Sequence, residues 1–188
     1  MRKTKKWRNV IVDAGLHCDW LVQMNALSLW SVHSTCEGHP LPIEAGEHSN
    51  SHMSLILKHK FYLTLGKTWD QNRSALEKLF YKCFTHFQTN WDVCHQRNGN
   101  TDHIRNFDPP EASKEETEIA DNVEKFLNDH STTNDCIGLH LDHTEQRQSE
   151  EMPESVARWW EETIRSLKEL DEKMAELTGS ALNNQERD

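Results

Sequence analysis

The hydrophobic pattern in the first half of the chain alternates between strand and helix periods. A short apolar run with β-branched residues at 9–13 predicts a strand, and apolar residues at helical spacing predict a helix over 16–27. Residues 29–36 alternate and residues 52–65 are rich in strand formers, so both segments are predicted to be strands. A helix with one apolar stripe follows, and a further alternating segment at 91–97 predicts another strand.

Alternation assigns the side chains of two of these strands to faces. Within 29–36, one face is predicted to carry Trp30, Val32 and Ser34. Within 91–97, one face is predicted to carry Trp91, Val93 and His95, and the other Asp92, Cys94 and Gln96. Because neighbours along a strand point to opposite faces, Cys94 and His95 cannot form a thiol–imidazole pair.

Beyond Pro109-Pro110 the pattern predicts a helical extension with one added strand. Ser113 and Glu116 form a capping-box pattern before a helical stretch, and residues 136–143 predict a short strand. Pro153 then begins a long helix, which Gly179 is placed to end. Its apolar residues recur about every 3.5 positions, the period of a coiled-coil seam: Val156, Trp160, Ile164, Leu167, Leu170, Met174 and Leu177. We expect this seam to pack on the chain's own domain, with homodimerisation through the helix as the alternative.

Together these elements predict an α+β fold. The sheet is expected to be mixed or antiparallel, with helices on one side of it and a long C-terminal helix. The proline pair divides the chain into a His-rich α+β body over 1–108 and an acidic helical extension over 109–188, which packs on the body.

Charge sharpens this division. With 188 residues, 35% hydrophobic and 28% charged, the chain can bury one core, which excludes collagen-like, low-complexity and wholly disordered classes. The net charge of −10 separates into +3 over 1–108 and −13 over 109–188. Since a negative field repels phosphate backbones, we do not expect nucleic acid as a partner, and the acidic helix suits protein contacts better.

Cysteine usage and hydropathy indicate the compartment. The five cysteines are scattered and contain no Cys-x-x-Cys pair, which favours reduced thiols. The apolar run after the basic start is too short for a secretory signal, and the sequence contains no apolar stretch of about 18 residues. We therefore expect a cytoplasmic protein with no membrane segment.

The candidate chemistry concentrates in the segment Ser34-Thr35-Cys36-Glu37-Gly38-His39, with two further histidines beyond it. Two residues separate Cys36 from His39, and three separate His48 from His52, so each pair can reach one ion. Thiolate and imidazole are ligands that zinc prefers. The segment is thus a candidate metal site, with zinc as the ion, formed by Cys36, His39, His48 and His52; another interpretation of the same residues is ordinary surface histidines and a buried cysteine.

The alternative is a pocket for a small organic ligand at the same place. Its predicted lining is Asp13, Ser34, Cys36, Glu37 and Gly38. Asp13 ends the first predicted strand, and it joins Cys36 at one sheet end only if their two strands run parallel, as a β-α-β unit requires.

A resemblance adds a third interpretation. Val12-Asp13, Met24-Asn25 and the segment Ser34 to His39 resemble the start of the wybutosine-synthesis Tyw-three family, in which a strand leads into Ser-Ser-Cys-Ser-Gly-Arg. Uncharacterised microbial proteins carry a similar Ser-Cys-Glu-Gly-His phrase. The resemblance covers residues 10–40, and His39 stands where the family has Arg.

This resemblance implies an S-adenosylmethionine-dependent methyltransferase that acts on a modified guanosine in tRNA, with Ser34, Cys36 and Gly38 in its active-site loop. Three functions therefore follow from the sequence. The first is a protein that binds a small molecule or metal ion at the Cys36–His39 loop. The second is the RNA-modifying transferase, and the third is a non-enzymatic interaction protein that uses its acidic C-terminal helix.

Overall fold

The structure of the protein is a computed structural model that describes residues 4–7, 10–40, 50–85, 88–106, 135–149 and 151–185. The helical stretch expected after Ser113 and the candidate ligand His48 lie outside these residues.

Five strands form one antiparallel sheet, and two shorter strands form a separate hairpin. In the sheet the order is β3-β4-β7-β5-β6, and every neighbouring pair is antiparallel. Its strands are β3 (Trp30–Cys36), β4 (Asn50–Leu57), β5 (Thr89–Arg97), β6 (Asn100–Arg105) and β7 (Cys136–Gln146). The hairpin pairs β1 (Thr4–Trp7) with β2 (Val10–Asp13).

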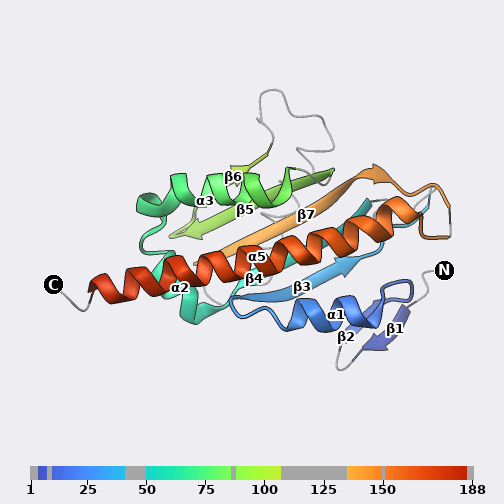
Figure 1. The fold of residues 1–188 in the computed structure, drawn as a ribbon, viewed down its shortest axis with the longest axis horizontal. Coiled ribbons are helices and arrows are strands. Elements are labelled where there is room, and N and C mark those ends of the chain that lie inside the picture. Colours follow the sequence, from blue (N-terminus) through green and yellow to red (C-terminus); the bar gives the residue numbers. More distant parts are fainter. Residues whose placement is uncertain are drawn as a thin grey trace.

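The helices gather on one face of this sheet, with the longest helix across its middle. Their bounds are α1 (Cys18–Asn25), α2 (His59–Leu65), α3 (Trp69–Phe84) and α5 (Glu154–Gln185). In Figure 1, α5 crosses in front of the strands, with α3 along one side of it and α1 along the other. The α+β class, the antiparallel sheet, the one-sided helices and the long C-terminal helix are thus confirmed. Among the described helices, none has the length and apolarity to span a membrane.

Two predicted element boundaries are wrong. The strand expected over 52–65 ends at Leu57, and α2 follows it, because Tyr62 and Leu65 are buried at a helical spacing that outweighs the strand propensity of the segment. The last helix continues past Gly179 to Gln185. Glycine costs a helix about 1 kcal/mol relative to alanine, which is a weaker effect than the breaking of a helix by proline.

The predicted faces of the first sheet strand are half right. Val32 pairs with Leu55, but the register shifts at a bulge before Ser34, which pairs with Ser54. An extra residue in a strand reverses the facing of every side chain after it. Ser34 therefore lies on the face opposite to Val32, and Cys36, paired with His52, lies on that face too.

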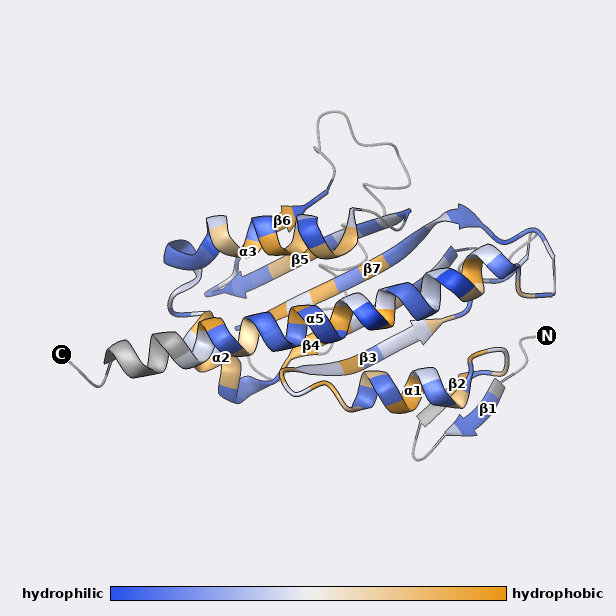
Figure 2. Ribbon diagram, viewed as in Figure 1, coloured by the Kyte–Doolittle hydropathy of each residue, from blue (hydrophilic) through white to orange (hydrophobic). Residues whose placement is uncertain are grey.

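The two faces of the sheet differ in chemistry. The face toward the helices is apolar and buried, and carries Met53, Leu55, Leu57, Trp91, Val93, Leu139 and Leu141. The opposite face carries polar side chains that are also buried: His52, Ser54, Asp92, His140 and Asp142. We call this second set the polar layer. In Figure 2 the strands accordingly alternate between hydrophobic and hydrophilic positions.

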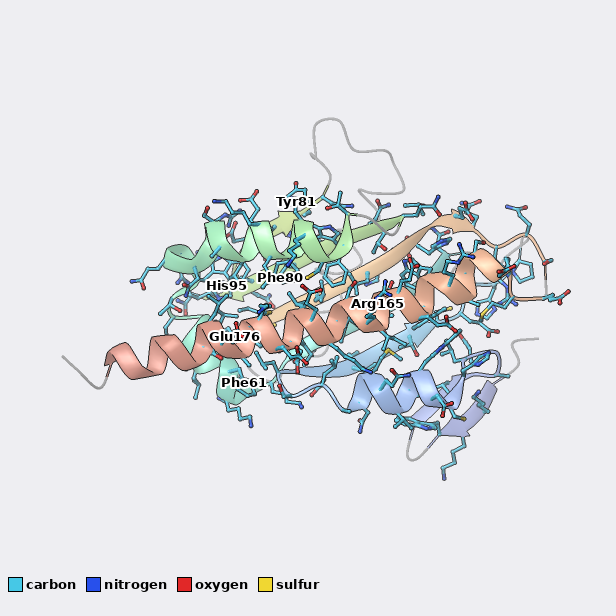
Figure 3. All side chains as sticks on the ribbon, in the orientation of Figure 1. Phe61, Phe80, Tyr81, His95, Arg165 and Glu176 are labelled. Atoms are coloured by element: carbon cyan, nitrogen blue, oxygen red, sulfur yellow. The ribbon has the colours of Figure 1, made fainter. Side chains whose placement is uncertain are left out.

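The predicted seam of α5 forms the centre of the core. Its residues from Val156 to Met174 are buried, and the Trp160 ring stacks on that of Trp20 at a centroid distance of 5.6 Å. The helix contacts α1, α2 and α3, so the seam packs within the chain. In Figure 3, Phe80 and His95 lie between the ribbons of α3 and α5, whereas Arg165 of α5 is exposed.

The predicted division at residue 108 stays a prediction, but the extension supplies central elements of the fold. Strand β7 lies between β4 and β5 in the middle of the sheet, and α5 covers the apolar face (Figure 1). A homodimer through α5 likewise remains a prediction.

One carboxylate joins α5 to the start of β3. The Asp171 carboxylate accepts hydrogen bonds from the Ser28 amide at 2.7 Å, the Ser28 hydroxyl at 2.7 Å and the Leu29 amide at 2.8 Å. Asp171 is buried. If its carboxylate were removed, these three donors would be left without a hydrogen-bond partner in a place where water cannot fully replace it.

We expect Asp171→Ala to lower the free energy of unfolding by about 3 kcal/mol, since it leaves two amides and a hydroxyl unpaired. Urea denaturation measures the change. The control is Glu172→Ala, which removes an exposed carboxylate from the next position of the same helix. An equal loss in both variants would show that Asp171 does not anchor the helix.

Candidate functional site

Three side chains with metal-ligating atoms converge where β2 and β3 end. One carboxylate oxygen of Asp13, the Sγ of Cys36 and one ring nitrogen of His39 all lie within 4.8 Å of one another. All three residues are buried. The backbone of Gly38, with φ at +78°, turns the chain between Cys36 and His39. This conformation is easily reached by glycine and strained for most other residues.

The convergence does not use the parallel strand pair that the sequence suggested. Strand β2 pairs with β1, outside the five-stranded sheet. Instead, the Glu37 amide donates a hydrogen bond to Asp13 Oδ2 at 3.1 Å. His39 Nε2 lies 3.8 Å from the same oxygen. The carboxylate of Asp13 thus lies beside the chain that leaves β3.

Arg147 and Ser51 hold the other side of this chain segment. The Arg147 guanidinium donates a hydrogen bond to the Gly38 carbonyl at 2.8 Å and lies 3.5 Å from Glu37 Oε1. The Ser51 hydroxyl donates to the Glu37 carbonyl at 2.5 Å. Arg147 is buried, so its charge is offset by that of Glu37 with little help from water.

The Glu37 carboxylate lies against the backbone of Gly15. A Cβ at residue 15 would stand 1.7 Å from Glu37 Oε2, so only glycine leaves room for the carboxylate as it is placed. Burial raises the pKa of Glu37; Arg147 opposes the shift, and Asp13 adds to it. Glu37 Oε2 is buried without a hydrogen-bond partner among the described residues.

The structure brings together five of the residues predicted for the site. Asp13, Cys36, Glu37, Gly38 and His39 form one cluster. The geometry therefore joins the predicted metal ligands Cys36 and His39 with the predicted ligand-binding residue Asp13.

Two other predicted residues lie next to the cluster rather than in it. His52 pairs with Cys36 across β3 and β4, but its ring lies 5.5 Å from that of His140, centroid to centroid. It is not one of the three converging ligands. Ser34 pairs with Ser54 further along β3.

Three residues around the site were not predicted from the sequence: Arg147, Gly15 and Ser51, whose hydroxyl bonds the Glu37 carbonyl. Arg147 reaches Gly38 across 109 positions of the chain, and no local pattern marks such a contact. Gly15 follows Asp13 closely, so a glycine two residues after a candidate carboxylate was the available signal.

Next to His52, the polar layer buries an acid. Asp142 pairs with His52 across β4 and β7, and its Oδ2 accepts a hydrogen bond from the Asn50 amide at 3.1 Å. Burial raises the pKa of Asp142 from 3.8 to about 7, and the Asn50 bond opposes the shift.

We expect Arg147→Met to lower the free energy of unfolding by about 3 kcal/mol, because it leaves the buried Glu37 carboxylate without its cation. Chemical denaturation measures the loss. Arg158→Met is the matched control, since Arg158 is exposed and lies 3.6 Å from Glu154 on the helix surface. A loss in Arg147→Met no larger than that of the control would contradict the role of Arg147.

A second expectation concerns pH. Asp142 binds its proton more tightly in the folded protein than in the unfolded chain, so its contribution to the unfolding free energy falls as the pH rises from about 4 to about 7. Asparagine has no proton to lose, so Asp142→Asn should be more stable than wild type by on the order of 2 kcal/mol at about pH 8 and nearly equal to it at about pH 4.

Denaturation over this pH range, taken as the difference between the two proteins, tests the expectation. Burial also lowers the pKa values of His95 and His143, and these shifts make the unfolding free energy rise with pH, opposite to the effect of Asp142. Both histidines are present in the two proteins, so their effects cancel in the difference. Glu161→Gln, on the exposed surface of α5, is measured in parallel as the matched replacement of a carboxylate by an amide. A constant difference between Asp142→Asn and wild type would refute the assignment.

Comparisons of the chain with protein-family models, with curated proteins and with solved structures gave no match. The resemblance to the Tyw-three family therefore stays a prediction from the residues that carry it.

Proposed function

We propose that the protein binds a divalent transition metal, zinc by its ligand chemistry, through Asp13, Cys36 and His39. The observation that carries this proposal is the convergence of a carboxylate oxygen, a thiol sulfur and an imidazole nitrogen within 4.8 Å of one another. Oxygen, sulfur and nitrogen from these three residue types are the ligands that zinc accepts in proteins.

The spacing of the three atoms supports a common ion. Zinc bonds of about 2.0–2.3 Å in a tetrahedral arrangement place ligand atoms roughly 3.3–3.8 Å apart. His39 Nε2 lies 3.8 Å from Asp13 Oδ2, within that range. The same nitrogen is buried without a hydrogen-bond partner among the described residues, so coordination would satisfy it.

The balance of buried charge also supports the proposal. A thiolate at Cys36 and the carboxylate of Asp13 would together neutralise a doubly charged ion. The second carboxylate, that of Glu37, already has the Arg147 guanidinium at 3.5 Å. The Glu37 amide bond to Asp13 Oδ2 orients the carboxylate from outside the ligand set, as partners of metal ligands commonly do.

Three protein ligands leave one coordination position of zinc available, which is the arrangement that binds water or a small-molecule ligand. His52 is the residue that could fill this fourth position. Its Cα is paired with that of Cys36, and both side chains lie on the same face of the sheet. His52 is therefore the candidate for a fourth ligand, although its ring lies against that of His140 in this structure.

Metal analysis tests the proposal directly. Protein purified without chelator should contain about one equivalent of zinc, and Cys36→Ala and His39→Ala should each contain less than about a tenth of an equivalent. The matched controls are Cys83→Ala, which removes a buried thiol from α3, and His17→Ala, which removes an exposed imidazole. Both controls should keep the metal. Less than about a tenth of an equivalent in wild type would end the proposal.

Cobalt substitution decides how many ligands the protein supplies. Cobalt bound at the site should give a thiolate-to-metal charge-transfer band that Cys36→Ala loses and Cys83→Ala keeps. If His52 is a ligand, His52→Ala should shift the cobalt spectrum and lower the affinity; if the fourth position is open, added azide should perturb the wild-type spectrum. Circular dichroism of each variant separates loss of metal from loss of fold.

Calorimetric titration of the same samples with S-adenosylmethionine tests the transferase that the resemblance implies. If S-adenosylmethionine still binds after zinc has been removed, the result would favour a pocket for an organic ligand at the Cys36–His39 loop.

A further inference from the structure

A second group of reactive side chains lies on the polar face of the sheet, away from the cluster at Cys36. Asp92 and Cys94 are two residues apart on β5 and therefore share a face. His103 on β6 pairs with Cys94 across the hairpin, so it lies on that face as well. The sequence pattern ruled out His95 as a partner for this thiol, and the neighbouring strand supplies one instead.

The three side chains form a directed chain of contacts. Cys94 Sγ lies 4.0 Å from His103 Nε2. The other ring nitrogen, His103 Nδ1, lies 2.9 and 3.0 Å from the two carboxylate oxygens of Asp92. A carboxylate at Nδ1 holds the proton there and leaves Nε2 as the acceptor that faces the sulfur. This is the relation of nucleophile, base and orienting acid that activates a thiol.

We propose that Cys94 is a nucleophilic thiol, activated by His103 as base and positioned by Asp92, that reacts with small hydroperoxides. This site is separate from the proposed metal centre, and neither proposal depends on the other.

The other buried cysteines provide a contrast within the same chain. Burial raises the pKa of Cys83 to about 11, and it raises the pKa of Cys136 to about 11 as well. Cys136 donates its weak hydrogen bond to a neutral amide oxygen, that of Gln96, at 3.8 Å. Thiolate formation is thus opposed at both residues, whereas Cys94 faces an imidazole that can take up its proton.

The burial of Cys94 limits the size of the molecule that can react with it. Cys94 has no exposed surface and the Asp92 side chain has none, whereas the His103 side chain is 15% exposed. A bulky acyl substrate cannot reach a thiol so enclosed without rearrangement of the protein. Hydrogen peroxide has only two heavy atoms, so a small displacement of the partly exposed His103 side chain would admit it to the sulfur, whereas an acyl substrate would need a larger opening.

The reaction balances with the hydroperoxide as the only co-reactant. His103 takes the thiol proton, and the Cys94 sulfur attacks one peroxide oxygen, so that an S–O bond forms as the O–O bond breaks. The sulfur is oxidised by two electrons and the peroxide is reduced by two. The departing hydroxide or alkoxide takes the proton from the His103 imidazolium, which yields water or an alcohol and leaves Cys94 as the sulfenic acid.

Peptide mass spectrometry after a brief exposure to hydrogen peroxide, with dimedone present to trap sulfenic acid, tests the proposal. The protein is kept in chelator, so that metal at Cys36 does not affect the reaction. Cys94 should be labelled at least about ten times faster than Cys83 or Cys136 in the same sample. A disulfide between Cys94 and Cys136, which share a small buried cluster, would report the same attack.

Two variants separate activation from structure. His103→Gln should reduce labelling of Cys94 to the rate of the other buried thiols. Asp92→Asn, which keeps the size of the side chain, should move the pH at which the labelling rate reaches its plateau toward higher values, because the imidazole loses its orienting charge. A variant with only a structural defect would expose all the cysteines alike and leave no such shift.

The proposal fails if Cys94 in folded wild-type protein is converted to the dimedone adduct and the disulfide together no faster than Cys83 is labelled, or if His103→Gln and wild type react at the same rate. Thermal denaturation confirms that each variant is folded under the conditions of the assay.

Discussion

The packing of the α5 seam on the apolar face of the sheet is the interaction on which the rest of the structure depends. Each buried seam side chain contributes on the order of 2 kcal/mol through removal of apolar surface from water, and six of them, from Val156 to Met174, lie in the core. The same helix contacts α1, α2 and α3, so it fixes their positions as well. Asp171 then sets the register of the helix against the start of β3.

The stability that the apolar face provides offsets the cost of burying polar side chains on the other face of the sheet. Asp92, His140 and Asp142 are all buried, and buried ionisable groups generally cost stability unless they are well paired. Some are paired: Asp92 with His103, and His140 Nδ1 with the Ser54 hydroxyl at 2.8 Å. Because strands fix the direction of each side chain, this face holds its reactive groups in defined positions, as binding and catalytic sites require.

The sequence predicted the fold where its information is local and periodic. The 3.5-residue spacing from Val156 onward identified the buried side of the last helix, and alternation placed Cys94 and His95 on opposite faces of β5. The bulge before Ser34 was beyond reach, because one inserted residue reverses the faces without changing composition.

The candidate site was predicted in the same partial way. Cys36 and His39 were identified by spacing, but the structure brings Asp13 to them by a route other than the parallel strands on which its approach to Cys36 was predicted to depend. Arg147 could not be found, since its contact with Gly38 joins distant parts of the chain. The position of His103 opposite Cys94 could have been predicted from the sequence. Asn98 and Gly99, both at positive φ, form the two-residue turn that pairs β5 with β6 and sets this register.

Strand order determines how the two sites relate. From β3 to β5 the sheet passes through β4 and β7, and three strand spacings of about 4.8 Å separate the strand of Cys36 from that of Cys94 by roughly 14 Å. A continuous row, Cys36–His52–Asp142–Asn90, crosses this interval on the polar face. His52 and Asp142 in this row are buried, so charge at one end is screened less than it would be on the surface. Asp142, whose pKa burial raises to about 7, therefore lies in the row of side chains that joins the strands of the two sites.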